Sequence, residues 1–273
     1  STVTNLCSFT TFVSCVLENR MQVDAVYCDF SKAFDMVQHS LLLQKLHRFG
    51  LSDAIIQILR SYLTGRVNYV EYQGIKSRLF QSKSGVPQGS VLGPLLFLLF
   101  IDDIMKCFLS EYLFYADDSK LYHVIKTVSD CETLQSDLQR LFQWCTLNRL
   151  QLNKDKCTVM TYTRKKTPII NDYNIDGQIL KRCTTFKDLG ITFDSKLTFN
   201  AHIEILCLQC YKLLGFLFRN TRDFDNRVLV RFFNAFIRSK LEYCSCVWNP
   251  YYDKYIHMIE AVQRKFLKTL YYR

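Results

Sequence analysis

The sequence predicts an α+β domain followed by a smaller helical domain. Before Phe199, β-branched and aromatic runs that are typical of strands alternate with segments of helical apolar spacing. From Phe199 onward only helical spacing remains. With 49% hydrophobic residues, 21 Phe and 16 Tyr, the 273-residue chain has ample material for a packed core and does not have the composition of a disordered chain.

The N-terminal part combines helices with a buried strand and a hairpin. The run at 23–30 is β-branched and aromatic, as expected of a buried strand. Gly50 is placed to end one helix and Ser52 to cap the next, while Gly74 separates two short strand-like runs. The predicted elements are helices at 6–17, 40–49 and 52–63, a strand at 23–30, and hairpin strands at 67–72 and 76–81.

A loop rich in glycine and proline interrupts this pattern at 85–94, which holds three of the nine glycines and two of the four prolines. This concentration indicates a specialised loop, and the apolar run after Pro94 predicts a buried helix. Asp117 and Asp118 are expected at the tip of a second hairpin. The remaining predicted elements are hairpin strands at 112–115 and 119–125, an amphipathic helix through 134–145, strands at 159–163, 175–180 and 189–193, and helices near 199–219, 225–241 and 254–271.

The net charge of +10 is unevenly distributed along the chain. Residues 1–150 contain 14 basic and 14 acidic side chains, whereas residues 151–273 contain 21 and 11. A basic half joined to a neutral half with acidic clusters is typical of a polyanion-binding module beside a metal-dependent site. A solvated basic surface would give the same counts. The longest apolar run, 91–101, is too short to span a bilayer.

The twelve cysteines lie in apolar segments without the spacing of a disulfide framework, so we expect them to be reduced. The closest pairs are Cys207 with Cys210, which follow His202, and Cys244 with Cys246. A structural zinc could use such residues. However, Cys207 and Cys210 also continue the apolar stripe of a helix, and no second pair has ordinary zinc-finger spacing.

Three acidic residues are the candidates for chemistry. Asp29 ends an apolar strand, where a carboxylate is costly unless it is solvated, paired or bound to metal. Asp117 and Asp118 are adjacent and flanked by aromatic residues, and a divalent cation would relieve their repulsion. Each feature has an ordinary alternative, because Asp is a common turn residue and Asp29 could simply cap the strand end.

Five segments indicate a protein family by their order and spacing along the chain. They are Asp29-Phe-Ser-Lys-Ala-Phe34-Asp35, Ser84-Gly-Val-Pro-Gln-Gly-Ser-Val-Leu-Gly-Pro94, Tyr115-Ala-Asp-Asp118, Leu152-Asn-Lys-Asp-Lys156 and Phe186-Lys-Asp-Leu-Gly190. In this order and spacing they resemble the successive palm motifs of reverse transcriptases, most closely those of jockey-like non-LTR retrotransposons. The ending from Leu241-Glu-Tyr to Trp248-Asn-Pro250 resembles the thumb region of that family.

This resemblance implies a right-hand polymerase fold with RNA-directed DNA polymerase activity. It implies a palm at 1–196, formed by an antiparallel sheet with packed helices and carrying a remnant of the fingers at 1–20. An α-helical thumb would follow at 197–273. Most of the fingers and an endonuclease would precede Ser1, so we expect this fragment alone to be weak or inactive.

The resemblance also implies roles for residues at the predicted site. Asp29 and Asp117 would bridge two Mg²⁺ ions, for which Mn²⁺ could substitute. The Phe30 carbonyl would help to hold the nucleotide-side ion, and Asp118 would face the primer. Phe34 would exclude the 2′-hydroxyl of a ribonucleotide, unless it is an ordinary core residue.

Other motif residues would contact the nucleotide and the nucleic acid. Gln88 and Gly89 match the loop beside the nucleotide and template. Lys156 matches the lysine near the triphosphate, although it could equally be a surface lysine. Leu189 and Gly190 resemble the turn that grips the primer end. The expected partners are an RNA template, a DNA primer and dNTPs, in the cytoplasm or nucleus and without a membrane.

The basic C-terminal helices would follow the phosphates of a template–primer duplex. Their apolar stripes, which include Leu213, Leu217, Phe232, Phe233 and Phe236, would face a core. The basic residues are Arg219, Arg222, Arg227, Arg231, Arg238 and Lys240.

Two further hypotheses stay open. A viral RNA-dependent RNA polymerase shares the palm, but Phe34 and the Tyr115-Ala116 pair before the acids disfavour it. A decayed or host-adopted copy would only bind nucleic acid, although the intact Asp29, Asp117 and Asp118 argue against long decay.

Overall fold

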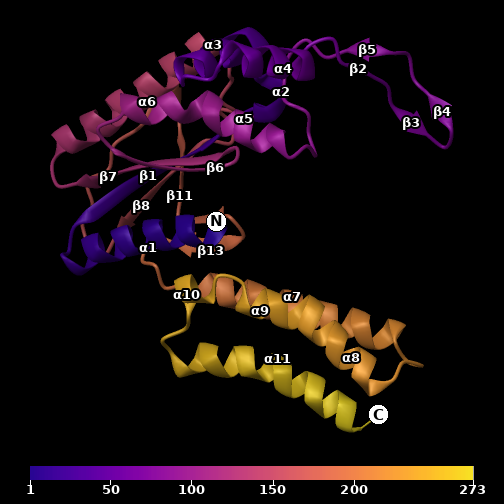
Figure 1. Cartoon of the computed structure of the whole chain (residues 1–273). Coiled ribbons are helices and arrows are strands. Elements are labelled where there is room, and N and C mark those ends of the chain that lie inside the picture. The colour runs from indigo at the N-terminus through magenta and orange to yellow at the C-terminus, as the bar shows by residue number, and fades with distance from the viewer. Residues whose placement is uncertain (273) are drawn as a thin grey trace. The chain divides into compact units, whose positions relative to one another are not determined.

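The computed structural model describes residues 1–272, which group into two compact units. Unit 1 comprises Ser1–Arg20, Tyr162–Arg164 and the chain from Thr184 onward. Unit 2 comprises Met21–Thr161 and Lys165–Cys183. Figure 1 shows strands and helices intermixed along the indigo to magenta part of the chain and helices alone in its last, orange to yellow part. The predicted α+β class with a helical C-terminal part is confirmed.

Unit 2 is built on a five-stranded sheet with the strand order β11-β8-β1-β7-β6. These strands are β1 (Gln22–Asp29), β6 (Glu111–Tyr115), β7 (Asp118–Ile125), β8 (Thr158–Thr163, whose last two residues belong to unit 1) and β11 (Lys181–Cys183). β7 pairs antiparallel with β1 and with β6, whereas β11 runs parallel to β8. The prediction of an antiparallel sheet is therefore wrong for the pair β8 and β11, whose long connection allows a parallel crossover.

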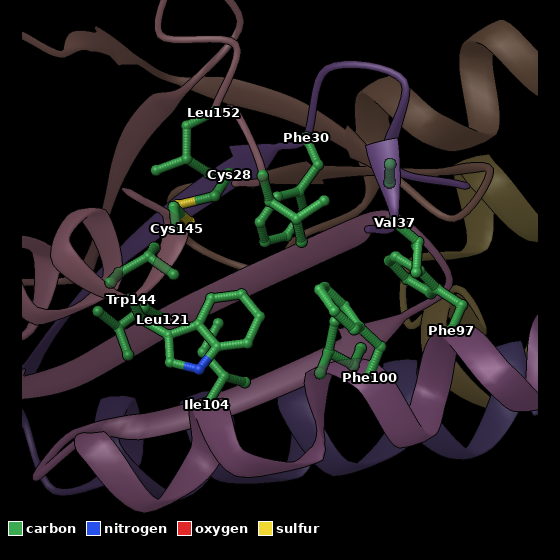
Figure 2. Close-up of a cluster of buried hydrophobic side chains, with 14 of the residues drawn as sticks. Cys28, Phe30, Val37, Phe97, Phe100, Ile104, Leu121, Trp144, Cys145 and Leu152 are labelled. Atoms are coloured by element: carbon green, nitrogen blue, oxygen red, sulfur yellow. The ribbon is translucent and has the colours of Figure 1, made fainter. Parts of the chain in front are cut away.

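Helices pack on the sheet of unit 2 and share one apolar core with it. They are α2 (Ala33–Met36), α3 (His39–Arg48), α4 (Asp53–Leu63), α5 (Leu92–Ile101), the 3₁₀ helix η1 (Asp102–Cys107) and α6 (Val128–Asn148). Figure 2 shows Phe100, Ile104 and Trp144 from these helices directed toward Leu121 of β7 and Phe30 at the end of β1. The burial of such large side chains fixes β1 and β7 against the helices.

Local signals in unit 2 behave largely as the sequence predicts. Gly50 adopts φ +88° after α3, and Ser52 occupies the N-cap position of α4. The predicted hairpin around Gly74 consists of two successive ladders, which pair β2 (Val67–Asn68) with β5 (Phe80–Gln81) and β3 (Glu71–Tyr72) with β4 (Ile75–Lys76). In Figure 1 this hairpin extends away from the sheet of unit 2.

The predicted strand at 175–180 is instead a tight hairpin of β9 (Asn174–Ile175) and β10 (Gln178–Ile179). Asp176 and Gly177 have φ values of +49° and +76°, which reverse the chain between two strand-like residue pairs. Apolar spacing alone does not reveal such a turn. This part of the prediction is wrong.

Unit 1 contains two strands and the C-terminal helices. Its elements are α1 (Thr2–Glu18), β12 (Thr185–Asp188), β13 (Ile191–Asp194), α7 (Asn200–Asn220), α8 (Asn226–Phe232), the π-helix η2 (Phe233–Arg238), α9 (Ser239–Glu242), α10 (Ser245–Trp248) and α11 (Asp253–Tyr271). Phe9 of α1 packs edge-on against Phe193 at 5.7 Å between ring centroids. Phe233 and Phe266 stack at 4.2 Å and join η2 to α11.

The predicted helix at 225–241 is one helical path divided into α8, η2 and α9. The π-helical stretch changes the angular spacing of its side chains, so the apolar stripe does not continue as predicted. Phe233 is buried, but Phe236 is 55% exposed. The expectation that Phe236 faces a core is wrong.

All twelve cysteines are free, as predicted. Cys207 and Cys210 are buried on α7, on the side that packs within unit 1. By length and composition alone α7 could also cross a membrane, a criterion that core helices equally satisfy. Its buried face packs against α11 and β13.

Candidate active site

The site begins where β1 leaves the core. The first seven residues of β1 are buried and Asp29, the eighth, is half-buried, with a side-chain exposure of 27%. In the antiparallel ladder Asp29 lies directly opposite Asp118, the first residue of β7. Residues opposite each other on neighbouring strands point to the same face, with Cβ atoms about 4.5–5.5 Å apart. The fold therefore places two carboxylates side by side at one end of the sheet.

Asp117 belongs to the turn before this pair. Tyr115 pairs with Asp118, so the turn residues are Ala116 and Asp117 and not Asp117 and Asp118 as predicted. Ala116 adopts φ +54°, a left-handed conformation that side chains other than Gly, Asn and Asp seldom adopt. Backbone strain of this kind is often found at functional sites. Asp117 and Asp118 are both exposed.

A second segment, residues 151–156, closes the other side of Asp29. Ser31 N–H donates to the Gln151 carbonyl and Asn153 N–H donates to the Asp29 carbonyl, both at 2.8 Å. These two bonds flank the bridge between Phe30 and Leu152. In this pairing the N–H and C=O of Phe30 point away from Leu152. The Phe30 carbonyl thus faces the side on which β7 pairs with β1.

Lys156 is the cation of the site. Its Nζ lies 3.3 Å from Oδ2 of Asp29, and the side chain is 67% exposed. The same segment is tied to the β9–β10 hairpin, because Lys154 Nζ contacts Asp176 Oδ2 at 2.5 Å. The structure therefore places Lys156 next to Asp29.

The donor set suits a hard divalent cation. Mg²⁺ is typically held by one or two carboxylates together with water and substrate phosphates. Cys28, which precedes Asp29, offers no thiolate, since its hydrogen bond with Cys157 and its burial raise the pKa of its thiol well above the usual value. Within residues 1–272, no three His, Cys, Asp or Glu side chains are gathered closely enough to enclose a metal ion. Asp29 and Asp118 thus form an opposed pair rather than a closed cage.

Phe34 lies next to the glycine-rich loop. Its half-buried ring packs on Phe97 at 4.6 Å between centroids, and its carbonyl accepts a hydrogen bond from Val86 N–H at 2.9 Å. Gly85 has φ +85°, and a Cβ there would lie 2.8 Å from Cα of Asp35. Glycine is therefore required at Gly85 for the loop to approach this segment.

The same loop presents Gln88 and Gly89. Gln88 Nε2 donates to Asp35 Oδ1 at 2.8 Å, and Gly89 has φ +76°. The structure brings these residues together with Phe34 in unit 2. Asp35 was not predicted to have a role, although it closes the first motif. Its contact with Gln88 depends on tertiary structure.

Leu189 and Gly190 belong to unit 1 and form the turn between β12 and β13. The predicted strand at 189–193 therefore begins only at Ile191. Tyr243 donates its hydroxyl hydrogen to the Leu189 carbonyl at 2.9 Å. The sequence pattern marked the Leu241-Glu-Tyr segment but gave no sign of this contact.

Two opposed carboxylates at the end of a sheet are a donor set of the kind that metal-dependent phosphoryl transfer uses. Residues 4–193 match the model of the family described as Reverse transcriptase (RNA-dependent DNA polymerase), and the chain belongs to this family.

Named relatives agree with this family. The chain is 31% identical over 196 residues to the RNA-directed DNA polymerase from mobile element jockey of Drosophila melanogaster, covering 68% of this chain and 21% of that protein. It is 29% identical over 274 residues to the protein of the same name from Drosophila funebris, covering 93% of this chain and 29% of that protein. The resemblance to jockey-like polymerases is confirmed, and the chain spans less than a third of these relatives.

A solved structure is similar in fold. It is an apo telomerase from Candida Tropicalis truncated from the C-terminal domain, with a TM-score of 0.52 and 14% identity, covering 71% of this chain and 39% of that one. The mixed sheet with packed helices is thus a polymerase fold of the reverse transcriptase and telomerase type.

Proposed function

We propose that this chain is the catalytic part of an RNA-directed DNA polymerase that adds dNTPs to a primer 3′-hydroxyl on an RNA template. The observation that carries the proposal is the register of β1 and β7, which sets Asp29 opposite Asp118 within the family's motifs. In-line transfer to an α-phosphate requires that charge on the attacking and leaving oxygens be stabilised. Carboxylates in this position would hold cations, and these cations would stabilise the charge on the two oxygens.

Two Mg²⁺ ions, replaceable by Mn²⁺, would be held by Asp29, Asp117, Asp118 and the Phe30 carbonyl. When bound they would activate the primer hydroxyl and stabilise the leaving group. The direction of the Phe30 carbonyl and the all-oxygen donor set support this assignment. Asp117, in the turn next to this pair, would be the third carboxylate ligand.

The chain's own residues would provide positioning. Lys156, 3.3 Å from Asp29, would meet the triphosphate and donate a proton to the leaving pyrophosphate. Phe34 would stand below the sugar of the incoming nucleotide. Gln88 and Gly89, tied to the Phe34–Asp35 segment, would border nucleotide and template.

At domain level we propose a palm at 1–196, with a fingers remnant at 1–20, and a thumb at 197–273. The exposed arginines of α7, α8 and η2 support a thumb that follows duplex phosphates. Residues 1–20 nevertheless group with the C-terminal helices in unit 1.

The test is primer extension on an RNA template by the natural protein that contains this chain. Asp117→Asn should abolish extension while duplex binding persists, because a metal ligand is lost and not a template contact. Glu111→Gln is the matched control, an exposed acid at the far end of β6 that should leave extension unchanged. A near-normal rate for Asp117→Asn would remove Asp117 from the mechanism. Binding without any extension by the unaltered protein would favour a chain that only binds nucleic acid.

A further inference from the structure

Two cysteines from distant parts of the chain lie side by side in unit 1. Cys7 is on α1 and Cys246 is on α10, two helices that pack against each other (Figure 1). Their Sγ atoms are 3.6 Å apart, although the residues are 239 positions apart in the sequence. Both residues belong to unit 1, so the contact lies within one compact unit. The tertiary structure therefore creates a thiol pair that the spacing of the cysteines did not reveal.

The two sulfur atoms are close enough to bond after a small movement. A disulfide bond is about 2.05 Å long, so the Sγ atoms of Cys7 and Cys246 must approach each other by about 1.5 Å in total. Rotation about the two Cα–Cβ bonds moves the sulfur atoms by amounts of this size and leaves the helix backbones in place. The structure thus holds the reduced form of a pair that can close.

Solvent reaches this pair from the side of α10. Cys246 is exposed, whereas Cys7 is half-buried. Burial raises the pKa of the Cys7 thiol, and the hydrogen bond with Cys246 and the charges of Cys246 and Cys244 act in the same direction. The thiolate is the form of cysteine that attacks a disulfide. Because Cys7 is the less accessible thiol and keeps its proton more firmly, the first attack on an external disulfide falls to Cys246.

Two other cysteine pairs are shut off from solvent. Cys28 shares a hydrogen bond with Cys157, and both side chains are buried in the core of unit 2. Cys207 and Cys210 are buried on α7. A small oxidant reaches these four thiols only after local unfolding. Access to solvent therefore distinguishes the pair on α1 and α10 from these two pairs.

We propose that Cys7 and Cys246 are a redox modification site, at which a small disulfide of the oxidised glutathione class converts the two thiols into a disulfide that ties α1 to α10. The Cys246 thiolate attacks one sulfur of the small disulfide, which forms a mixed disulfide and releases one small thiol. Cys7 then gives up its proton and attacks Sγ of Cys246, which breaks the mixed disulfide and releases the second small thiol. The two protein thiols thus lose two electrons and two protons, and the small disulfide takes them up.

The new bond would act on the attachment of α1. Phe9, two residues after Cys7, packs edge-on against Tyr162 at 5.5 Å and against Phe193 at 5.7 Å between ring centroids. A disulfide between Cys7 and Cys246 adds a covalent link to this packing and closes a long loop. Such a link stabilises the folded state mainly by restricting the unfolded chain. Oxidation should therefore make the protein harder to unfold, and reduction should reverse the effect.

The cross-link is tested without catalysis, in the natural protein that contains this chain, so the result does not depend on polymerase activity. The protein is equilibrated with mixtures of oxidised and reduced glutathione, the remaining thiols are alkylated, and the peptides are identified by mass spectrometry. We expect a peptide pair that joins Cys7 to Cys246, with a yield that rises with the fraction of oxidised glutathione and falls to zero in dithiothreitol. Glutathione bound to Cys246 with no such peptide pair would overturn the proposal.

Variants assign the bond to the two sulfur atoms. Cys7→Ser and Cys246→Ser should each abolish the cross-link. The matched control is Cys15→Ser, which removes an exposed cysteine of α1 that lies about 12 Å along the helix axis from Cys7 and should leave the yield unchanged. An undiminished yield in Cys246→Ser, or a loss of the cross-link in Cys15→Ser, would overturn the assignment.

Thermal unfolding with and without dithiothreitol measures what the bond does. The oxidised protein should unfold about 5 °C above the reduced protein. Cys246→Ser should have one Tm in both conditions, equal to that of the reduced unaltered protein, which also shows that the serine does not disturb folding. A cross-linked protein with an unchanged Tm would overturn the stabilising effect of the bond.

Discussion

Replacing Asp118 by asparagine should stabilise the protein in the absence of divalent metal and weaken its response to metal. Asp29 and Asp118 are directly opposite on one face of the sheet, and like charges in such a pair are destabilising by about 0.2–1 kcal/mol. Lys156, 3.3 Å from Asp29, offsets part of this repulsion. We therefore expect Asp118→Asn, which keeps the shape of the side chain, to raise the free energy of unfolding by about 0.5 kcal/mol, or the Tm by about 1–2 °C.

Bound metal should make the unaltered protein more stable than Asp118→Asn. A cation present at ten times its dissociation constant stabilises the unaltered protein by about 1.4 kcal/mol. Asp118→Asn loses one ligand and should gain clearly less. The variant is then the more stable form in chelator and the less stable form in Mg²⁺ or Mn²⁺. This crossing distinguishes a metal-binding carboxylate from a structural one.

The assay is thermal unfolding followed by circular dichroism, in chelator and across a Mg²⁺ series. Glu111→Gln is the control, because Glu111 lies on the same sheet opposite the uncharged Tyr122. The Tm of this variant should change with Mg²⁺ by the same amount as the Tm of the unaltered protein. If Asp118→Asn is less stable in chelator as well, the repulsion argument is refuted. If its response to Mg²⁺ is undiminished, Asp118 is not a ligand.

Three further predictions concern other parts of the chain. Phe34→Val should lower the ratio of kcat/KM for dNTP over rNTP at least about tenfold, because the clash with a 2′-hydroxyl is relieved; an unchanged ratio would leave Phe34 as a packing residue. Asp137→Ala should lower the free energy of unfolding, measured in urea, by about 3 kcal/mol without changing the activity of the folded protein. The reason is that the buried carboxylate accepts hydrogen bonds from Ser110 N–H at 2.8 Å and from Arg140 at 2.6 Å. A loss below about 1 kcal/mol would contradict this. Burial lowers the pKa of His202 from its usual 6.5 to about 4 in the folded protein, so the stability that the neutral imidazole contributes is complete above pH 6.5 and is lost as the pH falls toward 4, by up to about 3 kcal/mol. His202→Gln should therefore reduce the difference in unfolding free energy between pH 7 and pH 4.5. An equal difference in both proteins would contradict the assignment.

Much of the chain could be predicted because its signals are local. The apolar run before Asp29 is long enough to specify β1, and Gly50 with Ser52 separates α3 from α4. The Gly85 loop was recognised from its composition, and its structural reason is a backbone approach that only glycine allows. Such features depend on residues close in sequence, so the amino-acid order alone expresses them.

Errors arose where a turn or a helix of unusual pitch interrupts an ordinary pattern. The hairpin at Asp176 and Gly177 reads as one continuous strand, and the turn at Leu189 places an apolar residue at positive φ. In the sequence, Phe236 has the spacing of an α-helical apolar stripe, but it lies in a π-helical stretch. At Leu189 the backbone conformation is stabilised by a hydrogen bond from Tyr243, which lies far along the chain.

The sequence by itself determined which residues are available for chemistry: the acids at Asp29, Asp117 and Asp118, Lys156, and the order of the motifs that carry them. Only the tertiary structure decided which of them meet. Strand pairing, not spacing, sets Asp29 opposite Asp118 and leaves Asp117 in the turn. A two-residue side-chain period leaves the register between distant strands unspecified, so it is selected when both strands bury their apolar faces against the same helices.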